Sequence, residues 1–418
     1  MTDVRVTGLS AANSVAAQRM AQADPVLVDV RPALAALPGM QPHMILTSGA
    51  PMPWSAYTGG QRRAIIGAAQ YEGLASSAQD ADARIAAGDI LVRACHDHGC
   101  VGSVTGVTSA SMPVLVVEDR NSGTCGHCLV YEGPARQRLT YGVWNDAVRD
   151  QLLHVRDVIG PALGAAVRAI GGLALKPIMR RALGMGDDLH SRNVAATSIF
   201  YQRMAVPLLT TPGSSDVALE VLRFLEKSEL FFLHVGMASG KATADTARDV
   251  AGSSIVTAMV VSEREFAIRV GGTGDTWFRA PLPPLEAKLF EGFTPDDLAF
   301  MGGESLIMET IGLGGMAAAA AFSLQDYSGG TPAAMIATNE QMYTITETEH
   351  PEFKIPFLGF RGTPLGIDVA KVVTTGVTPA IHMGAAHRDG GHIGAGLLRA
   401  PLEPFQEAVA ALHDAAVA

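Results

Sequence analysis

Residues 184–193 read GMGDDLHSRN, and a nearly unbroken apolar run, VAATSIFYQRMAVPLL, follows at residues 194–209. Gly184 and Gly186 interrupt the helical pattern that precedes this stretch, because glycine is unfavourable inside a helix. Paired acids are typical of a helix N-terminus, where carboxylates satisfy free backbone N–H groups. The stretch therefore predicts a new helix that begins at the acids and runs to residue 209.

A helix that begins at the acids sorts the polar side chains onto two faces. Residues three or four positions apart lie above one another on a helix, which places Asp187, His190 and Asn193 on one face. Asp188 and Arg192 share the other face. We predict that His190 transfers a proton while Asp187 orients its ring. Arg192 and Asn193 are predicted to bind an anion, and the alternative that these residues only cap a helix stays open.

The composition indicates an acidic, compact protein. The 418 residues carry a net charge of −10, which argues against a nucleic-acid-binding protein, because such a protein needs a basic face. Residues 311–324 are too short and too rich in glycine and alanine to span a membrane. The N-terminus shows no secretory signal, so we expect a cytoplasmic protein. With 48% hydrophobic and 17% charged residues, we also expect a homo-oligomer or a hetero-complex.

The order of helical and strand patterns predicts an α/β fold, with two α/β domains and a mainly helical middle domain. The predicted boundaries are residues 1–144, which include an HDHG loop, residues 145–250 for the helical domain, and residues 251–418. The predicted helices are residues 10–23, 60–71, 78–87, 194–209 and the alanine-rich 316–322. The predicted strands are residues 26–30, 90–94, 114–118, 254–261 and 265–270.

Four cysteines occur in two short clusters, CHDHGC at residues 95–100 and CGHC at residues 125–128. Cys-x-x-Cys is a common half of a zinc site, but a structural site normally has two regularly spaced halves. Free thiols are the favoured interpretation and no cofactor is predicted. Zinc bound by Cys95, Cys100, Cys125 and Cys128 stays the alternative.

Residues 96–113 are predicted to form a long polar loop with several glycines. Connections of this length are more often functional than idle, and their N–H groups can hold an anion. We therefore include His98 as a second candidate for proton transfer and His96 as a candidate for anion binding.

Two further glycine-rich segments carry polar side chains. Glu304 and Ser305 precede a helix start at residues 312–315, where backbone N–H groups can face an anion. His387 and Arg388 lie in GAAHRDGGH at residues 384–392. We predict His387 as a proton-transferring residue, and Arg388, Glu304 and Ser305 as anion-binding residues. The HDHG, MGDDLHSRN and GAAHRD segments are predicted to meet at one cleft.

The chain resembles the AllG-type family, which is associated with oxamate carbamoyltransferase. The resemblance runs nearly from end to end. It is carried by GQRRAIIGAAQYEG (60–73), SASMPVLVVE (109–118), MGDDLHSRNVAATS (185–198), SSIVTAM (253–259), IRVGGTGDTWFRAP (268–281), ESLIMETIGLGG (304–315), GTPLGIDVAKVVTTGVTP (362–379) and GAGLLRAP (394–401).

The resemblance implies phosphorolysis of oxalurate to oxamate and carbamoyl phosphate, in a complex with an acyl-CoA-synthetase-like subunit. The ligands would then be a small-molecule substrate and phosphate or carbamoyl phosphate. The chain departs from the family pattern at residues 102–104 (GSV) and 131–133 (YEG), and at Glu304, His382 and Arg388, so the substrate pocket is expected to differ. Two alternatives stay open, a metal-assisted amide hydrolase and a non-catalytic scaffold subunit.

Overall fold

The computed structural model describes residues 3–284 and 287–417 and shows an α/β fold. The α-helices are α1 (Asp3–Gln22), α2 (Ala33–Ala36), α3 (Gly59–Tyr71), α4 (Ala78–Ala87), α5 (Asp146–His154), α6 (Gly160–Ala169), α7 (Lys176–Gly184), α8 (Val194–Thr210), α9 (Ser215–Glu226), α10 (Phe231–Asp245), α11 (Ile307–Thr310), α12 (Gln325–Ser328), α13 (Pro332–Tyr343), α14 (Val369–Thr375) and α15 (Glu403–Val417). The strands are β1 (Pro25–Pro32), β2 (Met44–Thr47), β3 (Leu91–Ala94), β4 (Cys100–Val101), β5 (Thr108–Ser109), β6 (Pro113–Asp119), β7 (Cys125–Leu129), β8 (Leu173–Ala174), β9 (Val256–Val261), β10 (Glu265–Val270), β11 (Phe278–Pro281), β12 (Lys288–Leu289), β13 (Leu298–Met301), β14 (Thr346–Ile355), β15 (Arg361–Ile367), β16 (Ala380–His387) and β17 (His392–Arg399).

The first part of the chain builds two sheets. Five strands pair in the order β4-β7-β6-β1-β8, and three more pair in the order β3-β2-β5. Strands β1 and β6 run antiparallel, whereas β4 and β7 run parallel. The residues expected to form a loop at 96–113 are more regular than predicted, because they contain β4, β5 and part of a 3₁₀ turn, Cys95–His98. These short strands continue the sheets and so hold the loop in place.

The last part of the chain builds three smaller sheets. Their strand orders are β11-β10-β9, β12-β17-β16-β13 and β14-β15, with antiparallel pairing in each. The predicted strand at residues 265–270 coincides with β10, and its buried pattern agrees with an apolar strand inside the core. The alanine-rich segment is not the α-helix that we predicted. It forms a 3₁₀ helix, Gly314–Ala320, with a break at Ala317.

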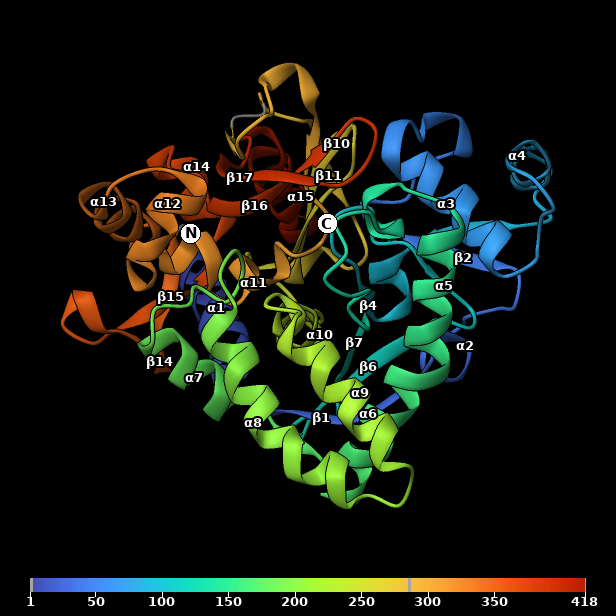
Figure 1. The fold of residues 1–418 in the computed structure, drawn as a ribbon. Coiled ribbons are helices and arrows are strands. Elements are labelled where there is room, and N and C mark those ends of the chain that lie inside the picture. Colours follow the sequence, from blue (N-terminus) through green and yellow to red (C-terminus); the bar gives the residue numbers. More distant parts are fainter. Residues whose placement is uncertain (1–2, 285–286, 418) are drawn as a thin grey trace.

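Helices dominate the segment between these two groups of sheets. In Figure 1, α8 and α9 lie along one edge of the molecule and α10 lies at its centre. Helix α10 is buried along most of its length and packs against β6 and β7. A Cβ atom on Gly126 of β7 would come within 2.2 Å of the Ala238 carbonyl oxygen of α10. Glycine at this position therefore allows the close approach of helix and sheet.

Helix α8 begins later than the sequence predicted. Its first residue is Val194 and its N-cap is Asn193, so the polar residues before it lie in a turn rather than on helical faces. Leu189 within this turn has a φ of 66°, a left-handed conformation that few non-glycine residues adopt. The predicted sharing of helix faces is therefore wrong, and the geometry of the turn places each polar side chain instead.

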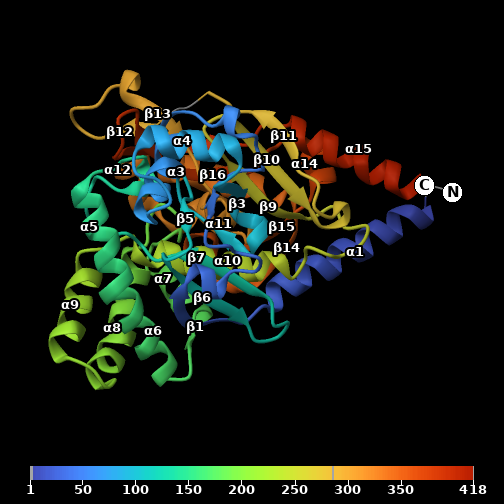
Figure 2. The same cartoon turned by 90° about the vertical axis from the view of Figure 1, so that its right-hand side faces the viewer.

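The helices α1 and α15 project toward the same end of the molecule (Figure 2). Every helix in the described part of the chain is too short or too polar to cross a membrane. The predicted domain boundaries at residues 144 and 250 stay a prediction. The largest hydrophobic core contains residues from all three predicted domains.

Candidate functional site

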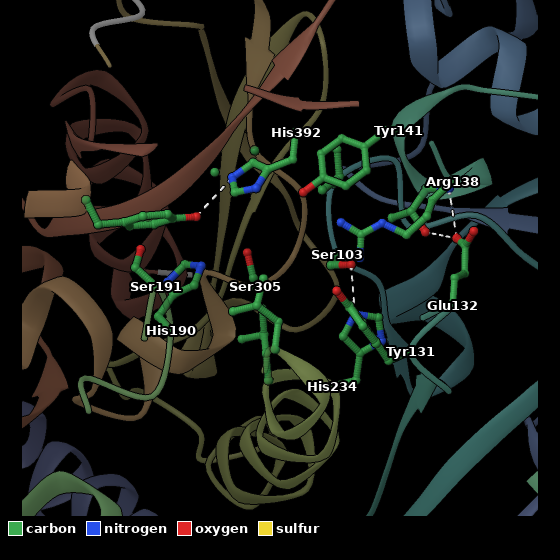
Figure 3. Close-up of a pocket in the computed structure, with 17 residues that line it drawn as sticks. Ser103, Tyr131, Glu132, Arg138, Tyr141, His190, Ser191, His234, Ser305 and His392 are labelled. Atoms are coloured by element: carbon green, nitrogen blue, oxygen red, sulfur yellow. Dashed lines mark hydrogen bonds between the residues drawn. The ribbon is translucent and has the colours of Figure 1, made fainter. Parts of the chain in front are cut away.

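A cavity lies between the two groups of sheets, with the end of α10 at its floor. It holds about 620 Å³ of empty space, its open mouth included. Figure 3 shows polar side chains surrounding this space from opposite sides. The residues that line the cavity are Ser103, Val104, Tyr131, Glu132, Arg138, Thr140, Tyr141, His190, Ser191, Leu230, Leu233, His234, Gly302, Ser305, Tyr327, Gly384 and His392.

His190 is a cavity residue whose ring is held by a buried carboxylate. Its Nδ1 lies 2.8 Å and 2.9 Å from the two carboxylate oxygens of Glu309, which is fully buried in α11. Nδ1 therefore donates to Glu309. Among the described residues, no group forms a hydrogen bond with Nε2, and His190 lines the cavity, so this nitrogen is available to a ligand.

The charges around His190 favour its protonated form. Burial lowers the pKa of His190, but the charge and hydrogen bond of Glu309, together with the charge of Asp188, outweigh burial and raise the pKa above the usual 6.5. Near neutral pH, the ring can therefore donate a proton from Nε2 into the cavity.

The two acids of the turn hold the backbone and do not orient His190. Asp188 accepts hydrogen bonds from the backbone N–H groups of His190 and Arg192 and pairs with Nδ1 of His382 at 2.6 Å. Asp187 pairs with Arg192 and accepts the N–H of Ala196 in the first turn of α8. The predicted pairing of Asp187 with His190 is thus replaced by pairing with Glu309, because α8 begins after the turn.

Arg192 and Asn193 lie outside the cavity lining. The guanidinium of Arg192 is 2.5 Å from the Asp187 carboxylate, so its charge is already paired. Asn193 donates from Nδ2 to the carbonyl oxygen of His190 at 2.8 Å. Both side chains therefore stabilise the turn that carries His190.

Arg138 is a buried cation in the cavity wall. It is 7% exposed, and its guanidinium lies over the rings of Tyr131 and Tyr141, at 4.9 Å and 4.8 Å from their centres. One contact reaches the Gly133 carbonyl oxygen at 3.4 Å, whereas Nε has no hydrogen-bond partner among the described residues. No carboxylate of residues 3–284 and 287–417 forms an ion pair with Arg138. A buried, unpaired guanidinium is suited to an anion.

Ser103 and His234 form a second polar pair in the cavity. Ser103 lies between β4 and β5 and forms an isolated antiparallel bridge with Gly303, and His234 projects from the first turn of α10. The Ser103 hydroxyl is 3.1 Å from His234 Nε2, and His234 Nδ1 is 2.7 Å from the Leu129 carbonyl oxygen. Burial lowers the pKa of His234 to about 4, so its ring is neutral near neutral pH.

Two residues of the segment before α11 have different positions. Ser305 lines the cavity, as its predicted role requires. Glu304 is fully buried behind the wall, where it accepts N–H groups from Gly49 at 3.1 Å and Gly102 at 2.9 Å. Burial raises the pKa of Glu304 to about 8. Glu304 therefore fixes the backbone of Gly102 next to Ser103. Its carboxyl group is occupied by these backbone N–H groups and does not line the cavity, so its predicted role in anion binding is wrong.

Three other predicted site residues lie away from the cavity lining. His98 Nδ1 contacts the Pro38 carbonyl oxygen at 2.7 Å, and His387 Nε2 lies 3.6 Å from Asp297. The backbone carbonyl of Arg388 accepts from Arg63 at 2.6 Å. The predicted meeting of three segments at one cleft is therefore wrong for these side chains: the HDHG segment contributes no residue to the lining, and the GAAHRD segment contributes only Gly384.

His96 belongs to a separate buried network on the far side of α10. Its Nδ1 lies 3.2 Å from the Lys241 ammonium, which also contacts Asp245 at 2.9 Å. Burial is the largest cause that lowers the pKa of His96 well below 6.5, followed by the charge of Lys241. His96 is therefore neutral and placed to accept from Lys241, outside the cavity.

The cysteines remain free thiols in this structure. Cys95, Cys100 and Cys128 are buried, whereas Cys125 is exposed. Across the described ranges, no three His, Cys, Asp or Glu side chains gather in an arrangement suited to a metal ion. The ligand set proposed for zinc does not assemble, because Cys125 lies at the exposed end of β7.

Several cavity residues were missed by the sequence analysis, namely Ser103, Tyr131, Arg138, Tyr141, His234, Tyr327 and His392. The departures at GSV and YEG gave one usable signal, because they include Ser103 and Tyr131. Arg138 and His234 gave none, since one lies in a polar loop and the other looks like part of an apolar helix.

Comparison with known proteins identifies close relatives over almost the whole chain. Residues 90–305 match the family model described as oxamate carbamoyltransferase subunit AllG. The oxamate carbamoyltransferase subunit AllG of Escherichia coli K12 is 35% identical, with 98% of each chain covered. The uncharacterized protein YahG of the same organism is 36% identical and covers 96% of this chain and 85% of its own length. A conserved protein of unknown function from Enterococcus faecalis V583 has a crystal structure with a TM-score of 0.96, 36% identity, and coverage of 98% of this chain and 99% of its own.

Proposed function

Because the chain belongs to the family of the oxamate carbamoyltransferase subunit AllG, we propose that its cavity binds the substrates of a carbamoyltransferase. The substrate is a ureido acid such as oxalurate, which reacts with phosphate. A phosphate oxygen attacks the carbamoyl carbon, and the bond from that carbon to the amide nitrogen breaks. The products are carbamoyl phosphate and oxamate, and the departing nitrogen takes up one proton.

The single observation that carries this proposal is the unpaired guanidinium of Arg138. Burial lowers the pKa of Arg138, but Tyr131, Tyr141 and the charge of Glu132 outweigh burial and raise it, so the guanidinium stays charged. Because no carboxylate of the described residues contacts the guanidinium, a bound anion can make that direct contact. Both substrates are anions, one through a carboxylate and the other through phosphate. The planar face of the guanidinium is held between Tyr131 and Tyr141, which fixes its direction for a bidentate contact.

His190 supplies the proton in this proposal. Its Nε2 has no hydrogen-bond partner within residues 3–284 and 287–417, and Glu309 holds the proton on Nδ1. The raised pKa favours a protonated ring that can donate to the departing amide nitrogen. Ser305 adds a hydroxyl to the same cavity.

The proposal includes assembly with other chains, because a relative that is 35% identical is named as a subunit. A wider groove of about 1200 Å³ adjoins the cavity and shares Tyr131, Arg138, Leu230 and His392 with it. We propose that activity arises in a hetero-complex, with an acyl-CoA-synthetase-like protein as the first partner to test, or in a homo-oligomer. Light scattering with and without co-expressed neighbouring subunits tests this assembly, and a lone monomer in both samples would contradict it.

The anion-binding role of Arg138 is tested by calorimetry on the full chain with phosphate and with oxalurate. Arg138→Met should weaken binding roughly 10- to 150-fold, because a hydrogen bond to a charged group contributes about 1.5–3 kcal/mol. Arg149→Met is the matched control, because this exposed guanidinium pairs with Asp146 and Asp150 on α5, away from the cavity lining. Unchanged binding in Arg138→Met, or an equal loss in Arg149→Met, would contradict the proposal.

A further inference from the structure

The hydroxyl of Ser103 has a fixed direction. A carbonyl oxygen only accepts, so the contact between His234 Nδ1 and the Leu129 carbonyl oxygen at 2.7 Å requires a proton on Nδ1. The ring is neutral, and its Nε2 therefore carries a lone pair. The Ser103 O–H must donate to that lone pair across 3.1 Å. The imidazole thus determines how the serine oxygen faces the ligand.

With its proton committed to His234, Ser103 offers only oxygen lone pairs to the cavity. Within the described part of the chain, no other donor forms a hydrogen bond with this oxygen. A ligand group that meets it must therefore bring an N–H or O–H. An ionised carboxylate only accepts hydrogen bonds and is therefore disfavoured there.

Hydrogen bonds on both sides of Ser103 fix its backbone and so fix the position of its hydroxyl oxygen. Glu304 accepts the N–H of Gly102 at 2.9 Å, and Thr105 donates to the Thr140 carbonyl oxygen at 3.2 Å. Val104 has a φ of 53°, which a β-branched residue adopts only when its surroundings impose it. The acceptor is therefore in place before a ligand binds.

We propose that Ser103 is the residue that recognises the terminal NH₂ of the carbamoyl group, and that it makes the cavity selective for carbamoyl over acyl compounds. This inference rests on the proposed function, and it identifies the NH₂ of the carbamoyl group as the part of the substrate that the cavity recognises. An amide NH₂ donates to the Ser103 oxygen, whereas a methyl group in its place cannot. Arg138 has the opposite character and binds the anionic part of the same ligand.

The test compares two ligands that differ only in this group. Phosphonoacetamide is a stable analogue of carbamoyl phosphate, and acetonylphosphonate has a methyl group in place of the NH₂. Calorimetry on the full wild-type chain should show that the amide binds roughly 2- to 13-fold more tightly, the range expected for one uncharged hydrogen bond. Ser103→Ala should abolish the preference, and Ser103→Thr, which keeps the hydroxyl, should retain it.

The outcomes separate this inference from the proposed function. If wild-type protein binds both phosphonates equally, or if Ser103→Ala keeps the preference, the role of Ser103 is overturned and the carbamoyltransferase proposal stands. If neither phosphonate nor phosphate binds, both are overturned. A carbamoyl adduct on Ser103 after incubation with carbamoyl phosphate would also overturn it, because the serine would then be a nucleophile. Nitrogen NMR of His234 in Ser103→Ala shows whether the fold and tautomer are intact.

Discussion

Replacing Glu309 by glutamine tests whether this buried carboxylate keeps His190 charged. Glu309 accepts from His190 Nδ1 at 2.8 Å, from the Gly315 N–H at 2.8 Å and from the His382 N–H at 3.1 Å. Glutamine is nearly isosteric, and its carbonyl oxygen can keep both backbone bonds. Only the charge-assisted bond to His190 is lost, which sets the cost at about 1.5–3 kcal/mol of unfolding free energy.

This cost must depend on pH in a stated direction. The pKa of His190 is raised in the folded protein, so its stabilising pair with Glu309 is fully present below the unfolded value of 6.5. The stabilisation is lost as pH rises through the folded pKa, where the ring becomes neutral. The difference between wild type and Glu309→Gln should therefore be largest near pH 6 and should shrink at alkaline pH.

Urea unfolding of both proteins at pH 6 and at alkaline pH measures the difference. Glu132→Gln is the matched control, because Glu132 is buried at the same cavity but accepts from the backbone N–H groups of Leu139 and Thr140, which do not titrate in this range. Its cost should stay constant with pH. A pH-independent cost for Glu309→Gln as well would refute the reasoning.

In the assembled enzyme, turnover of Glu309→Gln should fall roughly 100- to 10,000-fold if His190 is the acid.

Local sequence patterns were sufficient for many of the elements. The predicted helix at residues 78–87 coincides with α4, and the predicted strand at residues 265–270 coincides with β10. Both depend on periodic burial and on end signals within a few residues, such as the Ser77 side chain that caps α4. The alanine-rich segment failed because good helix propensity did not prevent a 3₁₀ conformation in a fully buried setting.

The candidate site could be predicted only where its chemistry is local. The GMGDDLHSRN stretch identified His190, but its partner Glu309 is 119 residues away and no spacing rule connects them. Leu189 adopts a left-handed backbone conformation, and α8 begins only at Val194. Asp187 therefore pairs with Arg192 and not with His190. Arg138 could not be predicted as a site residue, because its proposed role depends on its burial and on its contacts with Tyr131 and Tyr141, which only the fold shows.

Two further changes test how helix α10, whose first turn carries the cavity residue His234, is held in the fold. Lys241→Met should lower the free energy of unfolding by about 3–5 kcal/mol, because it leaves the partly buried Asp245 without its ammonium partner. Urea unfolding measures this cost. A cost below about 1 kcal/mol would contradict the role of this ion pair in stabilising the fold. Gly126→Ala should be more disruptive to the cavity, because its Cβ would lie 2.2 Å from the Ala238 carbonyl oxygen and 2.4 Å from the Ala242 nitrogen, both backbone atoms of α10 that cannot move singly. The helix must then shift as a body, and its first turn carries His234, so ligand affinity and melting temperature should fall together. Gly184→Ala, in the last position of α7 with no atom within 4 Å of the added Cβ, is the matched control and should be neutral or stabilise by up to about 1 kcal/mol. Equal melting temperatures for the two alanine variants would show that α10 tolerates displacement from β7, and the close approach at Gly126 would then not be what positions the cavity.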